Sequence, residues 1–243
     1  MRFVLTIILC FFFSTSGFAQ HANLLSGNSY FSNFNHLIYN DDYHTSVKPI
    51  IKSELKFDID SILELQYQSD YSNWYLRKLF SEHFIFLKGE DYNVITSPIF
   101  NLSNGREFID KKNTFTNTRG FIVEGDLGKK ISFFSSFAEN QSIFPNYIDA
   151  HIRDNRVVPG QGYARDFKET GFDYAMSSGY VSYRANKMFV VQFGHGKHFI
   201  GDGYRSLLLS DNSFNYPYLR IQTTFWKVQY TNLYTEFQDI NYF

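Results

Sequence analysis

The strongest constraint on the fold is an alternation of apolar and polar side chains, with a period of two residues, that begins near Asp91. The runs 92–102, 117–127 and 131–137 alternate in this way, and the last two are separated by Gly128-Lys129-Lys130. Successive side chains of a β-strand point to opposite faces of a sheet, so a period of two indicates strands rather than helices. The sequence therefore predicts an all-β, antiparallel fold.

Tight turns and long connections alternate along the predicted strands. The run 172–183 leads through a short turn at 184–187 to an apolar run at 188–193, and a glycine-rich loop follows at 194–206. A corner is predicted at 214–218, and one last extended segment from Leu219. Short turns on one side and long loops on the other are typical of an outer-membrane β-barrel and favour it over a β-sandwich.

Three further features of the strand region carry predictions of their own. Asn104-Gly105 predicts a hairpin turn, and Pro98 predicts a bend or an edge position within its strand. The segment 138–170 lacks clear periodicity and carries charges of both signs, so we expect a long, solvated, extracellular loop.

The first nineteen residues have the pattern of an export signal. Arg2 precedes an apolar run at 3–13, and small residues at Gly17 and Ala19 form a cleavage site. This run is too short for a membrane-spanning helix. The only cysteine, Cys10, lies inside the signal, so no disulfide or catalytic thiol is expected after cleavage.

Composition narrows the class further. Aromatic residues make up 20% of the chain, the formal net charge is −1, and no apolar run after the signal approaches the length of a membrane helix. The charge gives no field for nucleic acid, which is excluded as a partner. An exported, aromatic-rich chain that is polar on average fits a membrane barrel with an apolar outer face and a polar lumen. A secreted β-sandwich or jelly roll shares this composition.

Residues 20–90 are predicted to form an N-terminal arm with short periplasmic helices. Apolar residues at 59–67 keep a helical spacing, and Ser72-Asn73 is a capping pair before a short amphipathic helix at 74–84. Residues 91–243 are assigned to the barrel strands.

One long run resembles a known family. The run 193–211, Phe-Gly-His-Gly-Lys-His-Phe-Ile-Gly-Asp-Gly-Tyr-Arg-Ser-Leu-Leu-Leu-Ser-Asp, followed by Tyr216-Pro217-Tyr218-Leu219-Arg220, is similar to the Wzi-type capsule-assembly outer-membrane family. The similarity is to its Bacteroidetes branch, which includes the gliding-motility protein RemB. The runs 77–80, 116–121 and 157–162 fit the same resemblance, which covers residues from Trp74 onwards.

The resemblance implies an outer-membrane β-barrel with a small helical periplasmic part. It also implies a non-catalytic surface lectin that retains polysaccharide, or a role in gliding motility. Members of the family are considerably longer, so 91–243 is expected to be an incomplete, N-terminal part of the barrel. The polar Asp239 and Asn241 before Phe243 are wrong for a lipid-facing final strand, and about five to seven strands are too few for comfortable closure.

A cationic and aromatic patch is the candidate binding site. Aromatic faces and arginine forks suit sugar rings and carboxylates, although a plugged barrel wall would contain the same residues. Expected partners are outer-membrane lipid, capsular or extracellular polysaccharide, and other surface or motility proteins; no cofactor is expected. The polysaccharide-binding candidates are Lys197, His198, Tyr204, Arg205, Tyr216, Tyr218 and Arg220.

Alternatives from other classes remain open at the level of sequence. His195, His198 and Asp202 have a spacing compatible with a metal, but four nearby glycines favour a packed loop without a metal. Ser206 with either histidine would be the catalytic pair of an outer-membrane lipase or deacylase, for which no nucleophile motif is present. A simple pore is the third possibility.

Overall fold

The prediction of an all-β, antiparallel fold is confirmed. The structure, a computed structural model, describes residues 44–52, 55, 73–80, 82–210 and 212–238. Its elements in chain order are β1 (Val47–Lys48), α4 (Trp74–Phe80), β2 (Ile85–Lys88), β3 (Tyr92–Arg106), β4 (Asn113–Leu127), β5 (Ile131–Ile143), α5 (Asn146–Asn155), β6 (Val157–Val158), β7 (Gly162–Phe167), β8 (Gly171–Arg184), β9 (Phe189–Gly196), β10 (Phe199–Ile200), β11 (Tyr216–Phe225) and β12 (Val228–Thr235).

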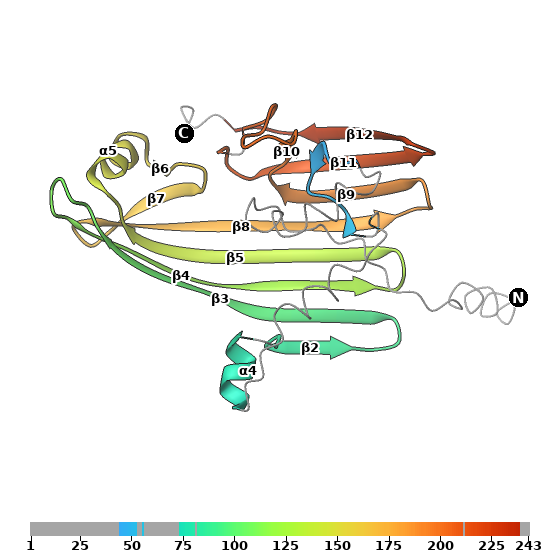
Figure 1. The fold of residues 1–243 in the computed structure, drawn as a ribbon, viewed down its shortest axis with the longest axis horizontal. Helices are drawn as coiled ribbons and strands as arrows, with labels where there is room; N and C mark the ends of the chain where they lie inside the picture. Colours follow the sequence, from blue (N-terminus) through green and yellow to red (C-terminus); the bar gives the residue numbers. More distant parts are fainter. Residues whose placement is uncertain (1–43, 53–54, 56–72, 81, 211, 239–243) are drawn as a thin grey trace, which may run out of the picture.

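One large sheet dominates the molecule (Figure 1). Its strands follow the order β12-β11-β9-β8-β5-β4-β3-β2, and each pair is antiparallel. The short β7 pairs with β8 beyond the end of β9. Among the described strands the sheet is open, with β2 and β12 at its two edges, and no closed barrel is formed.

The two ends of the sheet differ in the length of their connections, as the sequence predicts. Tight turns at 89–91, 128–130, 185–188 and 226–227 lie together at one end, on the right of Figure 1. Gly128 has φ +58° in one of them, where a side chain would be strained. The connections at 107–112, 144–170 and 197–215 lie at the other end, named here the long-loop end.

Several predicted boundaries are wrong because strand pairing extends further than local turn signals suggest. Asn104-Gly105 lies inside β3, paired with Phe115 and Thr114, and the turn falls at 107–112. Tyr216 begins β11 rather than forming a corner, and the last segment is two strands joined at Trp226-Lys227. Pro98 does occupy an edge, because β2 pairs with β3 only at 93–96.

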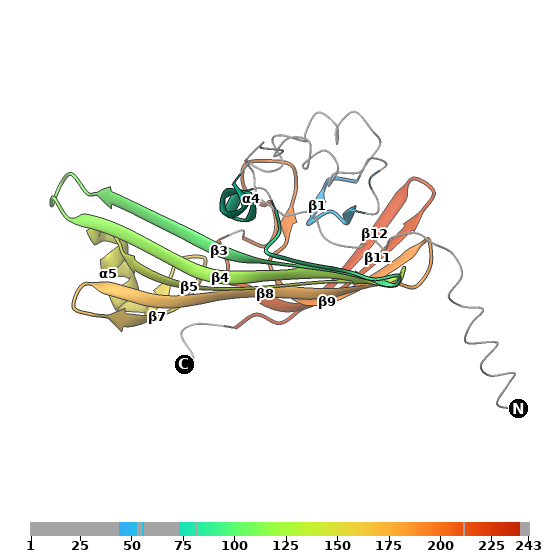
Figure 2. The same ribbon diagram turned by 90° about the horizontal axis from the view of Figure 1, so that it is seen from below.

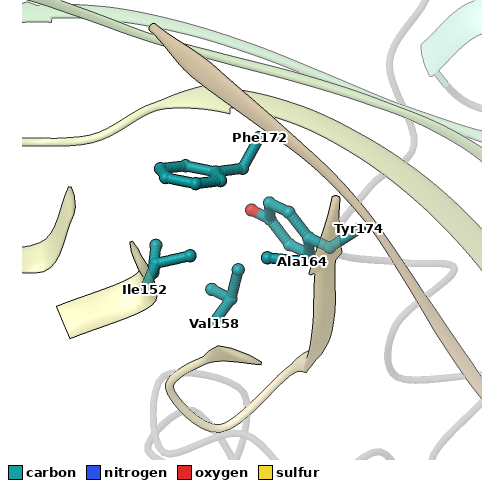
Figure 3. Close-up of a cluster of buried hydrophobic side chains, with 5 residues drawn as sticks. All are labelled: Ile152, Val158, Ala164, Phe172 and Tyr174. Atoms are coloured by element: carbon teal, nitrogen blue, oxygen red, sulfur yellow. The ribbon is translucent and has the colours of Figure 1, made fainter. Parts of the chain in front are cut away.

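The 138–170 segment is not an irregular loop, which corrects the prediction. β5 continues to Ile143, and α5, β6 and β7 then pack on the end of β8. Figure 3 shows the cluster that holds them together, with side chains from all four elements pointing toward one another. Arg156 ends α5 in the left-handed conformation and donates its N–H to Ile152 O. The buried members of the cluster are Ile152, Val158, Ala164, Phe172 and Tyr174.

The predicted amphipathic helix is present but shorter. α4 ends at Phe80, and Asn73 caps it by accepting a hydrogen bond from Tyr75 N at 3.0 Å. The helical spacing at 59–67 falls outside the described residues. None of the helices in the described ranges is long and apolar enough to cross a membrane.

The register gives the sheet two chemically different faces. On β5, the even-numbered residues are mostly small or polar, as are their partners on β4, and this side is named the polar face. On β8 the same face also carries larger side chains, Phe172, Tyr174, Met176 and Tyr180. The odd-numbered residues include Ile131, Phe133 and Phe137 and form the apolar face. β1 and α4 lie on one side of the sheet (Figure 2), and the contact of Arg220 with Pro49 identifies that side as the polar face.

Candidate functional site

Four of the predicted binding residues form a buried cluster on the polar face. His198, Tyr216, Tyr218 and Arg220 are only 2–4% exposed. Tyr216 Oη accepts the backbone N–H of His198 at 3.0 Å, and the ring of Tyr218 meets the His198 ring edge-on at 4.4 Å. In the described structure these side chains hold the connection that follows β9 against β11. The segment around Pro49 covers them. Burial gives these four side chains a packing role in the described structure.

Arg220 also anchors the segment that covers the cluster. Its Nη1 donates to Pro49 O at 2.7 Å, and the neighbouring Ile51 is fully buried. Lys48 forms an ion pair with Asp202 at 2.7 Å, which joins β1 to the connection 197–215. Both segments also contact the sheet, through Arg220 and Tyr216. The polar face therefore carries an inner layer built from segments far apart in sequence.

Burial changes the chemistry of His198. Desolvation, followed by the nearby Arg220 charge, lowers its pKa from 6.5 to about 3. Tyr216 Oη lies 3.3 Å from His198 Nδ1 and can donate its proton there, while Nε2 has no hydrogen-bond partner among the described residues. His198 is thus a neutral, packed ring at neutral pH.

The other three candidates lie nearer the surface. Tyr204 is 80% exposed, and the guanidinium of Arg205 lies 5.5 Å from the centre of its ring. Arg205 also donates to Asn212 Oδ1 at 3.1 Å, which holds the pair in place. Lys197 is half-buried and donates to Gly160 O. Tyr204 and Arg205 are therefore the predicted binding residues that are open to solvent.

The structure does not bring the proposed metal ligands together. His195 lies on the apolar face in register with Gly179 and Pro217, whereas His198 packs on the polar face, and Asp202 pairs with Lys48. Across the described ranges, no group of three or more His, Cys, Asp or Glu side chains is placed to hold a metal.

Ser206 has a local role in its loop. Its hydroxyl accepts the N–H of Ile200 at 2.9 Å and donates to Leu208 O. These bonds, together with Leu207 N to Ile200 O at 2.7 Å, close the turn after β10. Neither histidine is among the partners of this hydroxyl in the described structure.

A cleft of about 750 Å³ lies at the long-loop end, mainly on the apolar face. Its lining also includes Asn140, Tyr174, Met176 and Tyr216 of the polar face. Along one edge of β8, β9 pairs with residues 179–184 and β7 with 171–174, so 175–178 have no strand partner on that edge among the described strands. Asn215 partly fills this gap by donating to Ser177 O. β4, β5 and β8 line the cleft from one side, and 161–165, 213–217 and 236–238 line it from the others.

The cleft combines charges of both signs with aromatic rings. Arg119 stands opposite Glu139 across β4 and β5, and Arg165 stands opposite Asp173 across β7 and β8. The rings of Tyr163 and Phe214 lie 6.3 Å apart at its wall. Asp173 Oδ1 and Ser213 Oγ are buried without a hydrogen-bond partner in the described part of the chain. Such a site suits a ligand with hydroxyl groups, charges and an apolar ring face.

Sequence reasoning missed this cleft because strand pairing assembles it. Of the predicted binding residues, Tyr216 alone lines it. A weak signal was nevertheless present, since two runs that fit the family resemblance, 116–121 and 157–162, supply Arg119, Gln161 and Gly162 to its lining. These runs lie far apart in sequence and meet only through the β4-β5-β8-β7 pairing.

Comparison with known proteins identifies no relative. No family model matches the sequence, and no curated protein or solved structure is similar to the chain. The resemblance to the Wzi-type family stays a prediction, carried by the residues quoted for it.

Proposed function

We propose that the chain forms part of the wall of an outer-membrane β-barrel, with a non-catalytic role in capsule or exopolysaccharide assembly or in gliding motility. The observation that carries this proposal is a strip of mainly apolar side chains on the apolar face, named the apolar band, which Thr96, Ser135, Thr223 and Asn232 interrupt. It runs across the sheet from β3 to β12. Its members are Tyr92, Val94, Phe100, Leu102, Phe121, Val123, Leu127, Ile131, Phe133, Phe137, Val181, Tyr183, Phe189, Val191, Phe193, Leu219, Ile221, Phe225, Val228, Tyr230 and Tyr234.

Exposure of the band argues for a lipid environment. Phe193 is 66% exposed and Phe225 is 70% exposed, although both point away from the polar face and its inner layer. A water-facing surface rarely carries an apolar patch that extends across a whole sheet. Hydrocarbon around this face would remove the unfavourable contact with water.

The height of the band fits a bilayer. At about 3.4 Å per residue it spans roughly 20 Å along β4, from Phe121 to Leu127, and roughly 34 Å along β3, from Tyr92 to Leu102. On strands tilted by about 40°, these lengths correspond to heights of roughly 16 Å and 26 Å, which bracket the apolar belt of about 25 Å on outer-membrane barrels. Aromatic residues gather beside the tight turns, where Tyr92, Tyr183 and Trp226 lie, as in the girdle at a membrane interface.

The polar face has the chemistry of a lumen. Ser132, Ser142, Ser182, Gln192 and Gln222 are buried on it, and several bond across strands, as Gln192 does to Ser182 at 3.3 Å. Small and amide side chains leave room for the inner layer of β1 and the 197–215 connection. Polar side chains facing inward and apolar ones facing outward match the two environments of a barrel wall.

Contact with polysaccharide is assigned to the exposed Tyr204–Arg205 pair. A stacked ring and guanidinium offer an aromatic surface for a sugar and a fork for carboxylates. The proposed role needs no catalysis. In the described residues, the buried cluster packs the connection after β9 and Ser206 closes a turn.

The test is binding of surface polysaccharide, purified from the source strain, to protein reconstituted in liposomes. Tyr204→Ala and Arg205→Ala should each weaken binding by about tenfold, the loss expected for one ring or one charge-assisted contact. Tyr147→Ala, which removes an exposed ring on α5, is the matched control and should bind as the wild type does. Equal binding by all four proteins would refute the role of this pair.

A further inference from the structure

The cleft on the apolar face lies directly beside the apolar band. On β4 and β5, the ring pair Phe121–Phe137, with centroids 6.1 Å apart, is followed one same-face position later by the Arg119–Glu139 pair. The same step from band to cleft occurs on β9, on β11 and at the end of β12: Phe193 lies next to His195 on this face, Leu219 next to Pro217, and Tyr234 next to Glu236.

This position restricts what the cleft can hold. If the band faces hydrocarbon, the cleft opens at the level where polar head groups begin, on the outside of the wall. A ligand there has lipid on one side and water on the other, so an amphiphile fits better than a free polymer. This step rests on the proposed function.

The lining chemistry indicates the class of head group. Two guanidinium groups face three carboxylates, those of Glu139, Asp173 and Glu236, so the cleft is not built for a simple polyanion. Tyr163 and Phe214 supply ring faces, and the arginines and carboxylates of the lining supply hydrogen-bond donors and acceptors. Ring faces together with hydrogen-bonding groups of both kinds suit the alternating apolar and hydroxyl surfaces of a sugar.

We propose that this cleft binds the sugar head group of a membrane glycolipid whose acyl chains lie along the apolar band. Arg119 and Arg165 hold acidic or phosphate substituents of the head group, and the carboxylates accept its hydroxyl groups. The volume of about 750 Å³ lies within the range of small-molecule sites and accommodates a few sugar rings.

The experiment uses the full chain in nanodiscs of phosphatidylethanolamine and phosphatidylglycerol, with or without rough-type lipopolysaccharide as the glycolipid probe. Native mass spectrometry after release into mild detergent counts the retained glycolipid. The wild type should retain it, and the Tyr163→Leu/Arg165→Gln double variant should retain at least about tenfold less. Tyr147→Leu/Lys187→Gln, which changes an exposed tyrosine and a lysine outside the cleft, is the matched control.

Two further results would overturn the inference. One is full retention by the Tyr163→Leu/Arg165→Gln variant. The other is equally tight binding of the core oligosaccharide released from the same probe by mild acid, which would make the cleft a site for free saccharide. If the wild-type chain inserts into the nanodiscs but retains no glycolipid, the glycolipid site is rejected and the proposed function is not. If the wild-type chain does not enter the nanodiscs, the proposal that the apolar band faces lipid is rejected as well.

Discussion

At the scale of single residues, His198 has the most altered chemistry. Its pKa of about 3 lies below the unfolded value of 6.5, so the unfolded chain binds a proton in this range that the folded chain does not. The contribution to stability is complete above pH 6.5. It falls by up to about 1.4 kcal/mol per pH unit as the pH drops toward 3.

The variant His198→Asn tests this, since asparagine keeps an acceptor near Nδ1 and does not titrate. Urea unfolding in detergent, followed by circular dichroism, should show the wild type losing more stability than His198→Asn between pH 6.5 and 4. His151→Asn, on the exposed surface of α5, should lose stability as the wild type does. Parallel pH profiles for the wild type and His198→Asn would contradict a buried, neutral imidazole.

Residue identity alone did not separate buried from exposed members of the candidate site. His198 and Arg205 lie in one polar, glycine-rich run, yet the first is 2% exposed and the second lies on the surface. The difference arises from the side chains of β11, since Tyr216 and Tyr218 close over the histidine. Arg119 and Asp173 were missed because strand pairing and three further segments assemble the cleft from residues far apart in sequence.

At the scale of elements, positions on the apolar face should differ sharply in their tolerance of charge, according to whether they lie inside the apolar band or beyond it. Val181 lies in the apolar band on β8, whereas Asn104 lies on the same face of β3 beyond the band. Both are exposed, so in water Lys at either site would cost little. In a bilayer, Val181→Lys should destabilise the inserted state by about 2–4 kcal/mol and Asn104→Lys by less than about 1 kcal/mol. Unfolding titrations in liposomes measure both, and equal costs would argue against lipid along β8.

Strands with long alternating runs and the capped helix α4 were predictable, whereas α5 was not. β4 and β5 follow from their alternation and from the Gly128 turn. α5 was missed because its apolar face is short: Ile148 and Ile152, one turn apart, are the side chains that pack on the cluster, and most of the others are polar or charged. It is held by the cluster with Val158 and Phe172, and by Asp149, whose carboxylate pairs with Lys112 and Arg153.

At the scale of the whole molecule, the alternation of turns and loops was predictable, whereas the packing of the inner layer on one face depends on contacts such as Arg220 to Pro49.

The proposed orientation places the tight turns on the periplasmic side and the long-loop end outside. The only cysteine, Cys10, lies in the predicted signal, so single cysteines can report on this directly. Ile109→Cys, 88% exposed between β3 and β4, should react with a membrane-impermeant maleimide on intact cells. Lys187→Cys, in the turn between β8 and β9, should react only after the outer membrane is permeabilised. The reverse labelling pattern would invert the orientation and place the cleft at the periplasmic surface, where no surface glycolipid could reach it.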